Sequence, residues 1–174
     1  MGRLWSGGVG AAALLVAQLG CKPSVQAAPT ETPSVGGADQ ILTGVTTNLA
    51  VDGRRKNYVV ADSAFLFQEA QRMEFARIRV TIFDAEGQPA ATLSSKRAVY
   101  TIGSRVLDAR GDVLVVTPRG DTLRSARVTY DNDRRQFGGD SAFVFKGKAG
   151  PVNGKGFTAD EGLRNVVGGR KRPS

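Results

Sequence analysis

The stretch LDARGDVLVVTPRGDTLRSARVTYDNDRRQFGGDSAFVF, residues 107–145, contains the pattern on which the fold prediction depends. Apolar and polar residues alternate over 107–110 and again over 126–131. A period of two places every second side chain on one face of a β-strand. The segments TPRGD (117–121) and DND (131–133) interrupt these runs with residue types that favour turns. The stretch therefore predicts short antiparallel strands that share one apolar face.

The sequence also repeats itself at a spacing of roughly thirty residues. SKRAVYTIGSRVLDARGDV (95–113) aligns with SARVTYDNDRRQFGGDSA (125–142), which places one Gly-Asp pair (111–112) over another (139–140). We interpret each Gly-Asp pair as a break between strands. A period of this length indicates stacked hairpins, and chance recurrence within an ordinary antiparallel sheet is the alternative.

The remaining segments are also predicted to be strands. Residues 44–69 give one or two strands with a turn signal at Asp52-Gly53, and 72–84 gives another, in which alternate residues are apolar. The composition of 64–78 is compatible with a helix, but the apolar spacing of two on both sides favours two strands. Many short strands with turn signals between them indicate an all-β sandwich, jelly roll or open barrel.

The amino terminus has the pattern of a secretory signal. Arg3 precedes an apolar run (4–20) that ends at Cys21. Leu-Gly-Cys resembles the end of a bacterial lipobox, in which the cysteine is diacylated, although Gln18 stands where an aliphatic residue is usual. Residues 1–20 are therefore predicted to be a lipoprotein-type signal, with an uncleaved anchor as the alternative.

Composition divides the rest of the chain into three parts. Residues 21–40 are rich in Pro, Ser, Thr, Gly and Ala, which predicts a flexible tether. Residues 41–169 are long enough for one domain with its own core, and 170–174 form a basic tail. Cys21 is the only cysteine, so a disulfide framework is excluded.

The chain offers little for catalysis. It has no histidine, and a single cysteine after an apolar leader has no base to activate it. Asp108, Asp112, Asp131 and Asp140 are expected at turns, where aspartate caps backbone groups. No spacing singles out a carboxylate pair for sugar cleavage. We predict a protein that is not an enzyme, with no catalytic residues, metal site or cofactor.

The charge indicates an anionic partner. The chain has 24 Lys and Arg against 16 Asp and Glu, a formal charge of +8, with basic clusters at 54–56, 134–135 and 170–172. Anionic lipid headgroups or a membrane surface would attract such a protein, although many of these charges are also expected on solvated strand faces. No nucleic-acid-binding motif is present, so nucleic acid is not a predicted partner.

Several short motifs resemble one family. They are G-x-V-x-V (111–115), L-x-x-x-x-V-x-Y-D (123–131) and a late G-x-G-F (154–157). With the preceding YVVADSAF and RIRVTIFDAEGQPAATLSSKRAVY, their order resembles that of the LptC family of lipopolysaccharide-export bridge proteins, within the wider OstA-like group. The resemblance covers the body of the chain. It departs at the amino terminus, where family members with a typical spanning helix differ from this lipoprotein-like start.

The resemblance implies a fold and a set of partners. The fold is a single open β-jelly roll, with two antiparallel sheets in a V whose inner faces hold the acyl chains of lipopolysaccharide. The partners are lipopolysaccharide, the subunits of an inner-membrane ABC transporter, and a periplasmic OstA-like bridge protein that joins by edge-strand pairing. The implied location is the periplasmic face of the inner membrane, held by a lipid anchor at Cys21 or by an uncleaved segment. The edge at 41–51 would face the transporter, and the edge at 156–167 the next bridge protein.

The candidate lipid-binding residues are the apolar positions that the alternation and the motifs place on one inner face. They are Ile78, Val80, Ile82, Ala98, Tyr100, Leu107, Ala109, Val113, Val115, Ala126, Val128, Tyr130 and Phe157. The same residues would also build an ordinary closed core. The alternative function is accordingly a structural or adhesive envelope lipoprotein with a closed β-sandwich.

Overall fold

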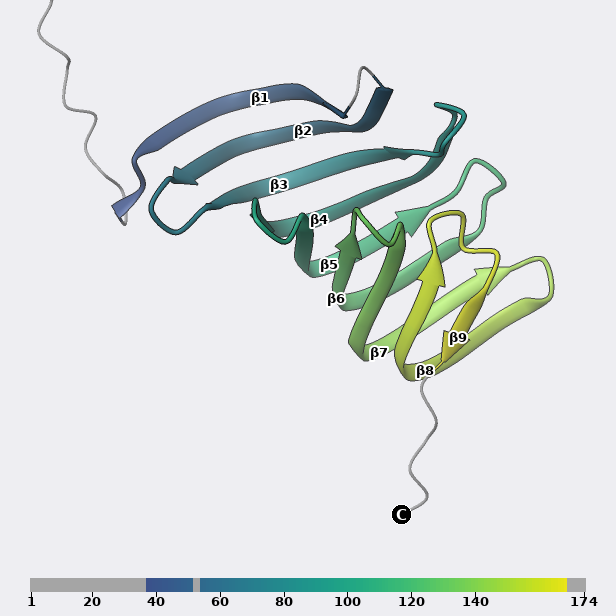
Figure 1. The fold of residues 1–174 in the computed structure, drawn as a ribbon. Helices are drawn as coiled ribbons and strands as arrows, with labels where there is room; N and C mark the ends of the chain where they lie inside the picture. Colours follow the sequence, from purple (N-terminus) through teal and green to yellow (C-terminus); the bar gives the residue numbers. More distant parts are fainter. Residues whose placement is uncertain (1–36, 52–53, 169–174) are drawn as a thin grey trace, which may run out of the picture. The chain divides into compact units, whose positions relative to one another are not determined.

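The computed structural model describes residues 37–51 and 54–168, which form nine β-strands (Figure 1). In chain order they are β1 (Gln40–Val51), β2 (Arg54–Phe67), β3 (Arg72–Phe83), β4 (Pro89–Thr101), β5 (Val106–Val116), β6 (Thr122–Asp131), β7 (Gln136–Gly147), β8 (Gly150–Asp160) and β9 (Val166–Gly168). The helical alternative for 64–78 is wrong, because β2 and β3 cover most of that segment and a short turn joins them.

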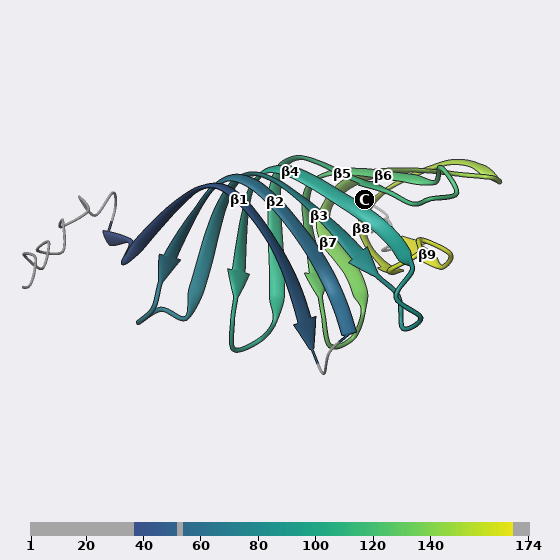
Figure 2. The same cartoon turned by 90° about the horizontal axis from the view of Figure 1, so that it is seen from above.

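The strands form one antiparallel sheet in which each strand pairs with its neighbours in sequence, from β1 to β9. β1 and β9 are the two edges of this sheet, which is not closed into a barrel. The prediction of an open all-β jelly roll is confirmed. One detail differs, because the V is made from a single sheet whose strands bend, rather than from two separate sheets (Figure 2).

The bend follows irregularities near the middle of successive strands. Strand register shifts between Ser94 and Arg97, Arg110 and Val113, Ser125 and Thr129, and Gly139 and Ala142. Bulges of this kind bend a strand and increase its twist. The Gly-Asp pairs at 111–112 and 139–140 lie at these positions, inside β5 and β7. Their interpretation as breaks between strands is therefore wrong.

Gly111 shows why the bend needs this residue type. Its φ is 79°, in the left-handed region, and a Cβ atom there would lie 3.2 Å from Cβ of Lys96 on the neighbouring strand. Glycine accepts this conformation without steric cost. Asp112 follows with φ 49° and pairs with Lys96 Nζ at 2.5 Å. Two similar ion pairs join other neighbouring strands, namely Arg77–Asp62 between β3 and β2 and Arg127–Asp140 between β6 and β7.

The aspartates do not all lie where the sequence predicted them. Asp108, Asp112 and Asp140 lie within strands, so their placement at turns was wrong. Asp131 ends β6, and its Oδ1 accepts hydrogen bonds from the backbone N–H groups of Asp133 and Arg134, as expected for a turn.

Most of the predicted amino-terminal and carboxy-terminal segments lie outside the residues that the structure describes. The signal (1–20), Cys21 and the tail (170–174) lie outside the described residues, as does the tether except for 37–40. Within 37–51 and 54–168, no helix has the length and apolar character needed to cross a bilayer.

Candidate functional site

The inner face of the bent sheet is one apolar cluster. All the predicted lipid-binding residues except Ala126 belong to it, eleven of them buried and Tyr100 half-buried. The outward positions Arg79, Arg110 and Asp112 are exposed, as the alternation predicts. The structure thus brings together residues from β3, β4, β5, β6 and β8 on one surface.

Ala126 is the exception, because its side chain is exposed. The register shift in β6 between Ser125 and Thr129 changes the phase of the alternation. Leu123 and Val128 are therefore both buried although they lie an odd number of positions apart. The inclusion of Ala126 in the inner face is corrected for this reason.

Several buried residues of the cluster were missed. They are Val59, Ala61, Ala64, Phe75, Ala91, Leu93, Leu123, Phe137, Phe143, Ala159 and Leu163. The alternation of Ala91 and Leu93 could have found those two. In β3, Phe75 and Ile78 are both inward, because Arg77 between them has a left-handed φ of 47°. Phe75 and Ile78 are three positions apart, so a strict period of two that places Ile78 on the inner face places Phe75 on the outer one.

The carboxy-terminal side of the inner face, around β7 and β8, is filled by aromatic rings. Phe143 and Phe157 have ring centroids 5.2 Å apart. Each ring lies over a glycine of the neighbouring strand, Phe143 over Gly154 and Phe157 over Gly139. A Cβ at Gly139 would be 2.6 Å from the Phe157 ring, so the close packing depends on the missing side chain.

The amino-terminal side retains a cavity of about 60 Å³ between β1 and β6, where Met73 is only partly buried. Of the predicted residues, Ile78, Val80, Tyr100, Leu107 and Tyr130 line this cavity. Burial raises the pKa of both tyrosine hydroxyls, so both stay uncharged at neutral pH. Among the described residues, the cavity is therefore an apolar space without a charged side chain in its lining.

The opposite ends of the strands approach one another along a line that we call the seam, defined by two contacts. Asn57, near the start of β2, donates from Nδ2 to Oδ1 of Asn132 in the β6–β7 turn at 2.6 Å. Arg119, in the β5–β6 turn, donates from Nη2 to the carbonyl oxygen of Gly162 in the β8–β9 turn at 2.8 Å. These contacts join the two sides of the V across its opening.

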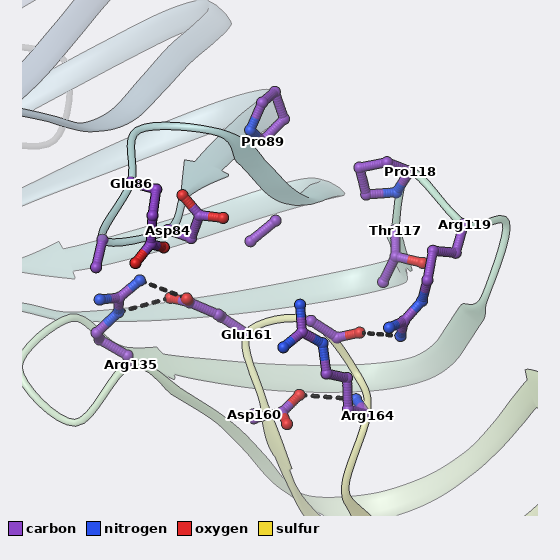
Figure 3. Close-up of a pocket in the computed structure, with 13 residues that line it drawn as sticks. Asp84, Glu86, Pro89, Thr117, Pro118, Arg119, Arg135, Asp160, Glu161 and Arg164 are labelled. Carbon is purple, nitrogen blue, oxygen red and sulfur yellow. Dashed lines mark hydrogen bonds and ion pairs between the residues drawn. The ribbon is translucent and has the colours of Figure 1, made fainter.

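A charged pocket of about 370 Å³ lies beside the second of these contacts (Figure 3). Two hydrogen bonds hold acidic groups of this pocket: the Arg135 guanidinium donates to Glu161, and the backbone N–H of Arg164 donates to Asp160. The hydrogen bond from Arg135 to Glu161 raises the pKa of the guanidinium. Such paired groups stabilise the turns at the seam. Among the described residues no set of three His, Cys, Asp or Glu side chains could hold a metal ion.

A family model for lipopolysaccharide-assembly, LptC-related proteins matches residues 21–167. The chain belongs to the LptC-related family. No curated protein matches the chain. Family membership assigns the chain to the bridge that transports lipopolysaccharide, and to the periplasm in association with the inner membrane. The open sheet with its apolar inner face agrees with that role.

Proposed function

We propose that this LptC-related protein accepts lipopolysaccharide from an inner-membrane ABC transporter and passes it along an inter-membrane β-jelly-roll bridge. The observation that supports this most directly is the apolar inner face with a cavity at its amino-terminal side. Acyl chains are apolar, and their transfer from water to such a surface lowers the free energy of the system. Since most inner side chains are buried against one another, the two sides of the V separate at the seam when a chain enters.

Photo-crosslinking tests this proposal. A photoreactive residue at Met73 should capture lipopolysaccharide, because that side chain lines the cavity. The same residue at Arg127, which lies on the outer face and pairs with Asp108, should capture none. Equal capture at both positions, or lipid-free protein by mass spectrometry of extracted material, would favour a structural envelope lipoprotein instead.

The bridge partners bind at the sheet edges in this proposal. Unpaired strand edges extend by addition of a strand from a similar domain. β1 presents Leu42, which is 45% exposed, toward the transporter, and the opposite edge presents Val167, which is 64% exposed, toward the next bridge protein. β9 has only 3 residues and pairs with β8 from Phe157 to Ala159, so part of β8 is also available as an edge.

A proline at Val166 tests the carboxy-terminal edge. Proline removes the backbone donor, so Val166→Pro should weaken association with the next bridge protein while the domain stays folded. Val166→Thr keeps the donor and the β-branched shape, and it should associate normally. Normal association of a folded Val166→Pro protein would exclude this edge.

Attachment through a diacylated Cys21 completes the proposal. Each buried methylene contributes about 0.8 kcal/mol, and stable anchoring needs more than one chain. Cys21→Ala should abolish acyl labelling and signal processing. Labelling that persists, or a mature protein that retains residues 1–20, would instead indicate attachment by an uncleaved segment.

A further inference from the structure

The cavity contains a buried polar atom that has no hydrogen-bond partner among the described residues. Asn57 is 5% exposed and lines the cavity from β2. Its Nδ2 group donates to Asn132, but its Oδ1 atom accepts no hydrogen bond from any described residue. Buried side-chain oxygens are bonded in the large majority of cases, so an unpaired one marks a place for a donor from outside the chain.

The orientation of the Asn57 amide is set by its neighbours. Asn132 Nδ2 donates to the backbone carbonyl of Arg105 at 2.7 Å, and a carbonyl oxygen can only accept. Asn132 must therefore present its own oxygen to Asn57. Reversing the Asn57 amide would place two oxygen acceptors 2.6 Å apart, so Asn57 must present its nitrogen and leave Oδ1 unpaired.

The surroundings of this atom restrict the donor. Val59, Ile78 and Leu107 make the lining apolar, and no lining residue that the structure describes is charged. A cationic donor would lose its hydration without gaining an opposite charge. A neutral hydroxyl carried on a hydrocarbon chain satisfies both features, since the chain meets the apolar lining and the hydroxyl meets Oδ1. The cavity has a volume of only about 60 Å³, and a hydroxyl is a substituent small enough for it.

We propose that this cavity is a subsite for a hydroxylated acyl chain, whose hydroxyl group donates to Asn57 Oδ1. The inference rests on the proposed lipid carriage and adds a chemical preference to it. Asn57 also forms one of the two seam contacts, so the hydroxyl would bind beside the point where the V closes. A chain without the hydroxyl would fill the same space and leave the oxygen unpaired.

Competition binding tests the preference. The full-length protein in detergent is loaded with a fluorescent fatty acid, which is displaced by a β-hydroxy fatty acid or by the unsubstituted acid of equal length. The hydroxylated acid should bind about tenfold more tightly, as expected for one hydrogen bond to a buried amide. Asn57→Leu should remove the preference. Thr47→Val, which changes a different polar group of the lining, should retain it.

The outcomes separate this inference from the proposed function. Equal binding of both acids to the unaltered protein would refute the proposed subsite, because the hydroxyl would then add nothing that a buried water could not donate to Asn57 Oδ1. Failure of both acids to bind would overturn lipid carriage itself. If Asn57→Leu does not fold, the NMR resonance of the Asn57 side-chain carbonyl in the unaltered protein tests the hydrogen bond instead. That resonance should shift with the hydroxylated acid only, and an identical shift with both acids would exclude the hydrogen bond.

Discussion

The two sides of the inner face differ in how they are filled. Around β7 and β8, the rings of Phe143 and Phe157 lie over glycines and contact one another at 5.2 Å. Around β2 and β3, the face keeps a cavity of about 60 Å³ beside the partly buried Met73. Separating the sides of the V would disrupt fewer close contacts at the cavity than around β7 and β8. The tightly packed rings make dispersion contacts that would be lost, whereas the side chains around the cavity make fewer of them.

Under the proposed function, this difference would give the bridge a direction. The cavity side lies near the β1 edge, which we assign to the transporter, and the aromatic side lies near the β9 edge. The seam contacts differ in the same sense. The Asn57–Asn132 bond joins two neutral amides at the cavity side, whereas Arg119 supplies a charged donor at the aromatic side. Under the proposed function, lipid entry would therefore be easier next to the transporter, and the aromatic side would resist opening.

A buried charge should reveal the largest difference between the sides. Val128 is 0% exposed and is not part of the cavity lining, so Val128→Glu should lower the free energy of unfolding by more than about 3 kcal/mol. Met73→Glu should lower it by less than about 1.5 kcal/mol, because a partly buried carboxylate can reach water. Urea denaturation measures both values. Equal losses would show that the two sides are equally closed.

Adding one methyl group tests the aromatic packing. A Cβ at Gly139 would lie 2.6 Å from the Phe157 ring and 2.9 Å from the Arg127 carbonyl oxygen. Gly139→Ala should therefore lower the free energy of unfolding by about 2–3 kcal/mol. Gly103→Ala, in a turn with no atom within 4 Å, is the matched control and should change it by less than about 0.5 kcal/mol. A tolerated Gly139→Ala would mean that the rings are loosely packed.

The charged seam contact should give a smaller effect. Arg119 bonds Gly162 across the seam and also holds the buried carboxylate of Asp121 at 2.9 Å. Arg119→Ala should lower the free energy of unfolding by about 1–2 kcal/mol. It should also speed hydrogen exchange in the β8–β9 turn more than at Asn57. Arg119→Lys keeps the charge but loses the planar fork, so it should fall between. Faster exchange at Asn57 alone would contradict the assignment of this contact.

The alternation of residues predicted the strands and most inner positions correctly. In Ile78, Val80 and Ile82 nothing interrupts the period of two, so the pattern and the structure agree. Ala126 failed because a bulge changes the phase inside β6. The Gly-Asp pairs at 111–112 and 139–140 were misinterpreted because bulges and turns favour the same residue types.

The seam could not be predicted from the sequence. Asn57 and Asn132 are 75 positions apart, and no local pattern links them. Their contact depends on how far the sheet twists and bends over many strands, and that angle is the sum of small local irregularities. The cavity and its unpaired oxygen follow from the same geometry. The motif G-x-G-F did mark Phe157, but its role became visible only through the register that places Gly139 opposite the ring.

Acidification should produce the smallest effect, and it should not distinguish the two sides. Asp108 lies on the outer face of β5, in the middle of the sheet, and accepts hydrogen bonds from Arg110 and Arg127. Burial alone would raise the pKa of its carboxyl, but the bonds from both guanidinium groups lower the pKa below its ordinary value. A lowered folded-state pKa means that this stabilisation is complete above the ordinary pKa and is lost as the pH falls through the lowered one.

Asp108→Asn should therefore reduce the loss of stability on acidification, and at neutral pH it should lower the free energy of unfolding by less than about 1 kcal/mol. Urea denaturation over a series of acidic pH values measures this slope. Because β5 and β6 connect the cavity side to the aromatic side, hydrogen exchange should change by the same factor in β2 and in β8. A change confined to β2 would show that the two sides unfold independently, and the comparison between them would then describe two separate cooperative units rather than one sheet with unequal packing.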